Sequence, residues 1–283
     1  MTGWSVVINS SSLNVALDSR SRYLRSLIVR GLIGGNRGHL GSSMSLVEIL
    51  RVLFDSFLKF RASEPKWSER DRFILSKGHG CLALYALLAD KDFFPMSALD
   101  EFCQSGGILG GHPESGKVPG VEASTGALGH GLPIGVGMAL AGRIRKQRYR
   151  VVVVTGDGEI NEGSNWEAAM SAAKHGLENL SVFIDYNKLQ SYGTTKEVCD
   201  LEPLADKWKS FGFSVREVDG HNVPALESCI NEVPFKSGRP SAIICHTVTG
   251  RGFEFAEGRP EWHHKSRFNI EDIDRIYAAL KDN

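Results

Sequence analysis

The second half of the chain alternates short apolar runs with amphipathic helical patterns, and this alternation limits the possible folds most. Residues 151–155, Val-Val-Val-Val-Thr, form a continuous β-branched run of the kind found in strands that are covered on both faces. Further apolar runs lie at 180–184, 214–218 and 242–245, and helical patterns lie at 165–175, 204–211, 223–233 and 271–280. Strands and helices that alternate at this pitch predict an α/β fold with a parallel central sheet and helices on both faces.

The first third of the chain, residues 1–105, has a helical pattern instead. Apolar residues recur at helical spacing in stretches that begin near Leu24, Leu46 and Gly80. The following stretch, 106–137, is rich in glycine and interrupted by prolines. It predicts active-site loops followed by the start of a helix.

Composition, charge and cysteine use indicate a soluble cytoplasmic protein. The 283 residues contain no internal repeat or linker, so we expect a single domain, 1–283, with its sheet in 150–283. A formal net charge of zero gives no reason to expect nucleic acid or membrane as a partner. No apolar run approaches the roughly 20 residues that cross a bilayer. The first residues lack a secretion-signal layout, and the five cysteines form no CxxC pair, as expected of reduced thiols.

The segment Thr155-Gly156-Asp157-Gly158 follows a predicted strand directly and precedes a predicted helix. Gly156 and Gly158 allow backbone N–H groups to approach a phosphate closely, and a helix N-terminus favours negative charge. A dinucleotide-binding turn is excluded, because Asn161 occupies the position where that turn needs a third glycine. An aspartate between the glycines would repel a diphosphate unless a cation lay between them. We therefore expect a metal-bridged diphosphate.

The next strand along the chain supplies a second candidate metal ligand, because Asn187 follows it closely. Right-handed crossovers place the carboxyl ends of neighbouring parallel strands at one edge of the sheet, so Asp157 and Asn187 can meet there. Mg²⁺ prefers about six oxygen ligands, and a backbone carbonyl such as that of Leu189 would add one more. The alternative is that Asp157 caps its helix and Asn187 lies in a turn. The two residues together favour the metal site.

These motifs resemble the thiamine-diphosphate signature, and the chain from 38 to 265 resembles the transketolase family. The resemblance includes Asn187-Lys188-Leu189-Gln190 and the stretch from Leu201 to Trp208. It implies the family's first domain, which holds the cofactor diphosphate. The implied cofactors are thiamine diphosphate and Mg²⁺, for which Ca²⁺ or Mn²⁺ can substitute. The implied activity is transfer of a two-carbon ketol unit from a ketose or ketose phosphate to an aldose or another aldehyde.

The same resemblance assigns roles to individual residues. The implied catalytic residues are His39, His79, His112 and His263. The implied cofactor contacts are His79, Gly126, Leu128, Gly156, Gly158, Glu162, Asn187 and His263, and the implied metal ligands are Asp157, Asn187 and Leu189. His112 would bind the terminal hydroxyl of the donor, and Glu162 would link two cofactor sites across a subunit interface. Histidine suits sugar chemistry because it titrates near neutral pH.

The sequence departs from the family pattern at two places. His130 stands where many relatives carry glutamine, and Ser191-Tyr192 stands where an apolar residue and an aspartate are common. Position 191 is expected to line the cofactor pocket. The substrates can therefore differ from the usual pentose phosphates.

The resemblance covers only the first domain of the family. In the family, the carboxylate that activates the pyrimidine ring and most arginines that hold a sugar phosphate lie in later domains. We therefore expect a second chain that carries the pyrimidine-binding and C-terminal domains, in an α₂β₂ assembly that acts on small sugars. Three alternatives stay open: one chain of another thiamine-diphosphate enzyme such as a 2-oxo acid decarboxylase or dehydrogenase, a specialised biosynthetic ketol transferase, and a non-catalytic regulatory subunit.

Overall fold

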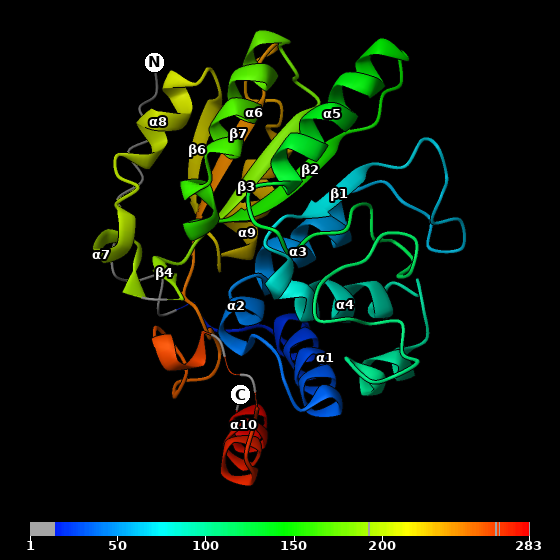
Figure 1. Cartoon of the computed structure of the whole chain (residues 1–283), viewed down its shortest axis with the longest axis vertical. Coiled ribbons are helices and arrows are strands. Elements are labelled where there is room, and N and C mark those ends of the chain that lie inside the picture. The colour runs from blue at the N-terminus through cyan, green and yellow to red at the C-terminus, as the bar shows by residue number, and fades with distance from the viewer. Residues whose placement is uncertain (1–14, 192, 264, 266, 283) are drawn as a thin grey trace.

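A parallel sheet forms the centre of the computed structural model, which describes residues 15–191, 193–263, 265 and 267–282 (Figure 1). Its five strands follow the order β1-β2-β3-β7-β6. They are β1 (Arg72–Leu75), β2 (Val151–Gly156), β3 (Leu180–Tyr186), β6 (Ser214–Asp219) and β7 (Ser241–His246). A short antiparallel hairpin, β4 (Leu189–Gln190) and β5 (Gly193–Thr194), follows β3. The predicted α/β class with a parallel sheet is confirmed.

Helices cover both faces of this sheet, and each face has its own buried core. One face packs against α5 (Gly131–Ile144), α6 (Gly163–Lys174) and α8 (Leu204–Ser210), and the other against α1 (Ser19–Gly35), α3 (Val47–Val52), α4 (Cys81–Asp90) and α9 (Val223–Asn231). In β2, Val151 and Val153 belong to the first core, whereas Val152 and Val154 belong to the second. Successive strand side chains point to opposite faces, so coverage on both sides explains the continuous apolar run.

The remaining elements are short, apart from the last helix. They are α2 (Leu40–Met44), a π-helical turn (Leu53–Phe57), α7 (Thr195–Cys199), α10 (Ile270–Asp282) and the 3-10 turns Gly78–Gly80, Met96–Glu101, Gly158–Asn161 and Pro260–Trp262. The last helix, α10, lies beside α1 at the bottom of Figure 1. Among the residues described, no helix combines the length and the apolar character needed to span a bilayer.

One strand lies outside the range in which the sequence predicts the sheet. β1 belongs to the first third of the chain, for which the pattern predicts helices, and it pairs in parallel with β2, with Arg72 opposite Val151. The prediction that the sheet is confined to 150–283 is therefore wrong. The apolar part of β1 is only Phe73-Ile74-Leu75, and such a short run cannot distinguish a strand from a buried helical turn.

Candidate active site

A cavity of about 200 Å³ opens at the carboxyl edge of the sheet, where β1, β2 and β3 end. Its lining residues come from the loops that follow these strands and from two segments near the ends of the chain. They are His39, Lys77, His79, Gly126, Leu128, Gly156, Asp157, Gly158, Glu159, Asn187, Leu189, Gln190, Ser191 and His263. All the expected site residues except His112 and Glu162 are therefore gathered around one cavity.

Asp157 and Asn187 meet at the floor of this cavity, and both are buried, with 2% and 8% exposure. The Asp157 carboxylate accepts hydrogen bonds from the backbone N–H of Gly158 at 2.8 Å and of Lys188 at 2.5 Å. It thereby joins the loops that follow β2 and β3. Asn187 Oδ1 accepts a hydrogen bond from Leu189 N at 3.0 Å, which holds its amide beside the hairpin.

Buried acidic groups outnumber buried basic groups around this floor. Asp157, Glu159 and Asp185 are each at most 2% exposed, and Lys77 is the one lysine or arginine among the described lining residues. Burial, followed by the charge of Asp185, raises the pKa of Asp157 to about 7, and burial raises the pKa of Glu159. Burial also opposes ionisation of Asp185, but the adjacent Lys77 ammonium outweighs it and lowers that pKa. A divalent cation would compensate the excess negative charge.

The donor set fits Mg²⁺. A carboxylate, an amide oxygen and backbone carbonyls are hard oxygen donors, and Mg²⁺ takes few protein ligands because it keeps water or phosphate oxygens. Within the described residues, no three His, Cys, Asp or Glu side chains are grouped as a metal site. A site built from Asp157, Asn187 and the Leu189 carbonyl needs no such group.

Glu159 is a site residue that the sequence motifs did not indicate. Its carboxylate accepts hydrogen bonds from Ser76 Oγ, from Gly129 N at 3.0 Å and from Gly156 N at 3.0 Å. These contacts tie together the ends of β1 and β2 and the loop that precedes α5. The available signal was its position two residues after Asp157 in a glycine-containing turn.

Three histidines surround the opening of the cavity. The ring centroids of His39 and His79 are 5.3 Å apart, and those of His79 and His263 are 6.1 Å apart. Burial, followed by the charge of Lys77, lowers the pKa of His79 well below its usual range. A neutral imidazole carries both a donor and an acceptor nitrogen, so His79 can exchange protons with hydroxyl and carbonyl groups.

His112 lines an adjoining cavity of about 80 Å³, which His39 and His79 also line. Its ring lies against Gly126, where an added Cβ would approach the ring to 3.0 Å. Burial, followed by the charge of Arg37, lowers the pKa of His112. His112 is therefore one step removed from the Asp157–Asn187 floor, on the side where a substrate would extend.

Four other positions that the sequence singled out lie at the margin. Glu162 is exposed and packs against Gly129, so its link across a subunit interface stays a prediction. Ser191 lines the cavity, whereas Tyr192 lies outside the described residues. His130 is exposed, with Nδ1 3.0 Å from the Leu128 carbonyl oxygen.

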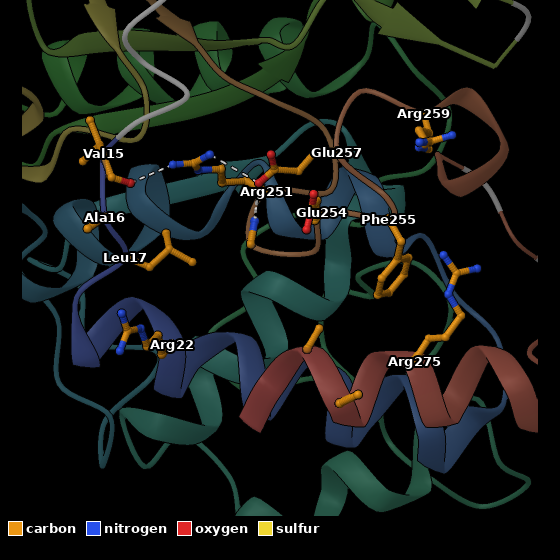
Figure 2. A pocket seen from close by; sticks show the side chains of 13 residues that line it. Val15, Ala16, Leu17, Arg22, Arg251, Glu254, Phe255, Glu257, Arg259 and Arg275 are labelled. Carbon is orange, nitrogen blue, oxygen red and sulfur yellow. Dashed lines mark hydrogen bonds and ion pairs between the residues drawn. The ribbon is translucent and has the colours of Figure 1, made fainter. Parts of the chain in front are cut away.

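A larger cavity, of about 740 Å³, lies between α1, the loop after β7 and α10 (Figure 2). Arg251 donates to the Val15 carbonyl at 2.7 Å and to Glu257 at 3.3 Å, and Arg275 lies 4.6 Å from the centre of the Phe255 ring. This cavity shares no lining residue with the cavity that contains Asp157 and Asn187. Its polar groups serve mainly to hold the loop after β7 against α1 and α10.

Comparison with known proteins identifies the family. The model described as "Transketolase, thiamine diphosphate binding domain" matches residues 18–280. The chain belongs to the transketolase family. One of the two chains of an apulose-4-phosphate transketolase from Actinobacillus succinogenes is 41% identical to this transketolase chain, over 94% of it and 95% of the relative. A 6-deoxy-6-sulfo-D-fructose transketolase subunit of Clostridium sp. is 39% identical, over 90% of the chain and 92% of the relative.

Solved transketolases show the same fold in a longer chain. Transketolase from Leishmania mexicana superimposes with a TM-score of 0.85 and 32% identity over 94% of this chain. The present transketolase chain spans only 41% of that protein. It therefore matches the curated subunits along almost their whole length but the solved enzymes over about two fifths.

Proposed function

We propose that this chain is the diphosphate-binding subunit of a two-chain transketolase, which transfers a two-carbon ketol unit from a ketose to an aldehyde. The observation that carries the proposal is the cavity itself. Asp157 and Asn187 are buried at its floor, and His39, His79 and His263 surround its opening. Relatives of matching length are named as transketolase subunits, which supports the same role here.

The floor would hold the cofactor diphosphate. Asp157, Asn187 and the Leu189 carbonyl would bind Mg²⁺, with Ca²⁺ or Mn²⁺ as substitutes, and the backbone at Gly156 and Gly158 would approach the phosphates. When bound, thiamine diphosphate supplies a nucleophilic carbon and an electron sink for the two-carbon unit. The buried carboxylates then face a cation that offsets their charge.

The histidines would act on the sugar. His39 and His263 would form hydrogen bonds with the substrate carbonyl and hydroxyl. His79, kept neutral by burial, would accept or donate a proton beside them. His112 would bind the terminal hydroxyl of the donor from the adjoining cavity. These roles orient the substrate and move protons, which is the contribution expected of the protein in a cofactor enzyme.

We further infer a partner chain. Relatives of matching length are named as subunits, a word that implies at least one other chain, and this chain covers 41% of a solved one-chain transketolase. The partner would carry the pyrimidine-binding and C-terminal domains in an α₂β₂ assembly, where the exposed Glu162 is available for contact between chains. All five cysteines are free thiols, which supports the proposed cytoplasmic location.

The test is recovery of the partner from the native host, followed by an assay with thiamine diphosphate, Mg²⁺ and a panel of substrates. The panel should include ketose phosphates and a sulfonated ketose, because the names of two relatives carry those groups. Ketol transfer that needs both chains would support the proposal. Transfer by this chain alone would refute the two-chain arrangement, and release of CO₂ from a 2-oxo acid would favour the decarboxylase alternative.

A further inference from the structure

Asp185 lies beneath the cavity floor and is fully buried, at 0% exposure. Its carboxylate accepts hydrogen bonds from Lys77 Nζ after β1, from Ser45 Oγ after α2 at 2.6 Å and from Thr247 Oγ1 after β7. It also accepts one from Asn187 Nδ2 at 3.5 Å. Donors from four segments of the chain therefore converge on one carboxylate directly behind a candidate metal ligand.

These contacts determine which way the amide of Asn187 faces. Its Nδ2 donates to Asp185 Oδ2, while its Oδ1 accepts from Leu189 N at 3.0 Å. A flipped amide would turn its oxygen toward the carboxylate and its NH₂ toward a backbone N–H, and both contacts would then be repulsive. Asp185 therefore favours the orientation in which the amide oxygen lies on the Leu189 side, where the expected metal ligands are.

Lys77 keeps Asp185 ionised in this position. The ion pair is buried on both sides, with side-chain exposures of 1% and 0%. The Lys77 stem lies over Gly156, because a Cβ added there would be 3.7 Å from Lys77 Cβ and Cδ. A buried carboxylate without its cation is strongly unfavourable, so the two side chains form one unit that spans the ends of β1 and β3.

We propose that Asp185, held by Lys77, Ser45 and Thr247, is a positioning residue that presents the Asn187 amide oxygen to the cation. This inference rests on the proposed function, because it requires that Asn187 bind Mg²⁺. Partners that orient a metal ligand from behind contribute about 10–100-fold to metal affinity. Asp185 acts through Asn187 and touches neither the cation nor the substrate.

The test is Asp185→Asn in the full chain, assembled with its recovered partner. Asparagine keeps the size and one acceptor oxygen, but its NH₂ group would compete with the donors that now converge on the carboxylate. The Kd for Mg²⁺, measured by calorimetry at saturating thiamine diphosphate, should rise about 10–100-fold. Affinity for Ca²⁺ should fall less, because Ca²⁺ tolerates irregular coordination and Mg²⁺ does not.

Glu48→Gln is the matched control. Glu48 is also a buried carboxylate, 1% exposed, and it accepts from Arg25 at 2.6 Å and from a His221 ring nitrogen at 2.8 Å. It does not line the cavity. This control should lower the Tm at least as much as Asp185→Asn and leave the Kd for Mg²⁺ unchanged. Should Asp185→Asn fail to fold, Thr247→Val, which removes one donor to Asp185, should weaken Mg²⁺ binding in the same direction.

Two results separate the inference from the function on which it rests. A parental Kd for Mg²⁺ and a parental preference for Mg²⁺ over Ca²⁺ in folded Asp185→Asn would overturn the positioning role while leaving the proposed function intact. A parental assembly that binds thiamine diphosphate without any divalent cation would refute the metal site itself, and the positioning role with it.

Discussion

Replacing Asp157 by asparagine should stabilise the cofactor-free chain at pH 8 and abolish its response to Mg²⁺. Burial and the charge of Asp185 raise the pKa of Asp157 from 3.8 to about 7. A carboxyl whose pKa rises on folding binds its proton more tightly in the native state, so stability falls as the pH rises through this interval. At pH 8 the parent chain bears the full cost of a buried, uncompensated carboxylate.

The size of the effect follows from two opposing contributions. The pKa change from 3.8 to about 7 corresponds to about 4 kcal/mol of lost stability at pH 8. Both Asp157 oxygens accept backbone hydrogen bonds, from Gly158 N and Lys188 N, and the amide nitrogen of asparagine cannot accept. That loss costs about 1–3 kcal/mol. The variant should therefore be more stable than the parent by about 1–3 kcal/mol at pH 8, and the difference should shrink toward pH 5.

Urea denaturation of the full chain in EDTA at pH 5, 6, 7 and 8 measures this difference. Adding Mg²⁺ and thiamine diphosphate at about 100 times their Kd should then stabilise the parent by about 2.7 kcal/mol and the variant not at all. Glu48→Gln should have the opposite sign at pH 8, because Arg25 and His221 outweigh burial and lower the pKa of Glu48. A variant that is less stable than the parent at pH 8, or one that keeps the Mg²⁺ response, would refute the reasoning.

Three further outcomes can be checked. His112→Ala should raise the donor KM about 3- to 10-fold, as expected for one lost hydrogen bond, with an unchanged cofactor Kd; equal losses in both would remove His112 from the substrate role. Gly78→Ala should lower stability by about 1–3 kcal/mol and weaken cofactor binding, because its Cβ would lie 2.7 Å from Thr125 Oγ1 and 2.9 Å from Gly126 N. Gly137→Ala, with nothing within 4 Å of its Cβ, should instead stabilise the chain by about 0.5–1 kcal/mol in thermal melts; a loss there would undermine the packing argument for Gly78. Purified alone, the chain should catalyse no ketol transfer in a coupled assay, and measurable turnover would contradict the need for a partner.

The convergence of Asp157 and Asn187 could be predicted because strand ends carry topological information. Each residue follows an apolar run, and parallel strands joined by one crossover must end at the same edge. The histidines were different, since no spacing in the chain connects His39 with His263. Their common location was implied only by resemblance to a family, and the cavity lining now shows them together.

The charged groups behind the site were beyond the reach of the sequence pattern. Lys77 and Asp185 lie 108 residues apart, and a single lysine or aspartate in a sequence is normally a solvated surface residue. Their burial depends on the pairing of β1 with the rest of the sheet, and β1 itself was too short to be recognised. Once that strand was missed, nothing placed Lys77 beside the end of β3.

The strand order also determines when the site can form during synthesis. In the described sheet β6 pairs with β7 alone, and β7 lies between β6 and β3 although it is the last strand made. A nascent chain that has not yet reached residue 241 therefore has a β6 without its sheet neighbour, and it also lacks Thr247, one of the donors to Asp185. The cation floor consequently closes late on the ribosome, after most of both cores has been made. Until then, the exposed edge of β3 is a place where a chaperone or a second nascent chain could bind.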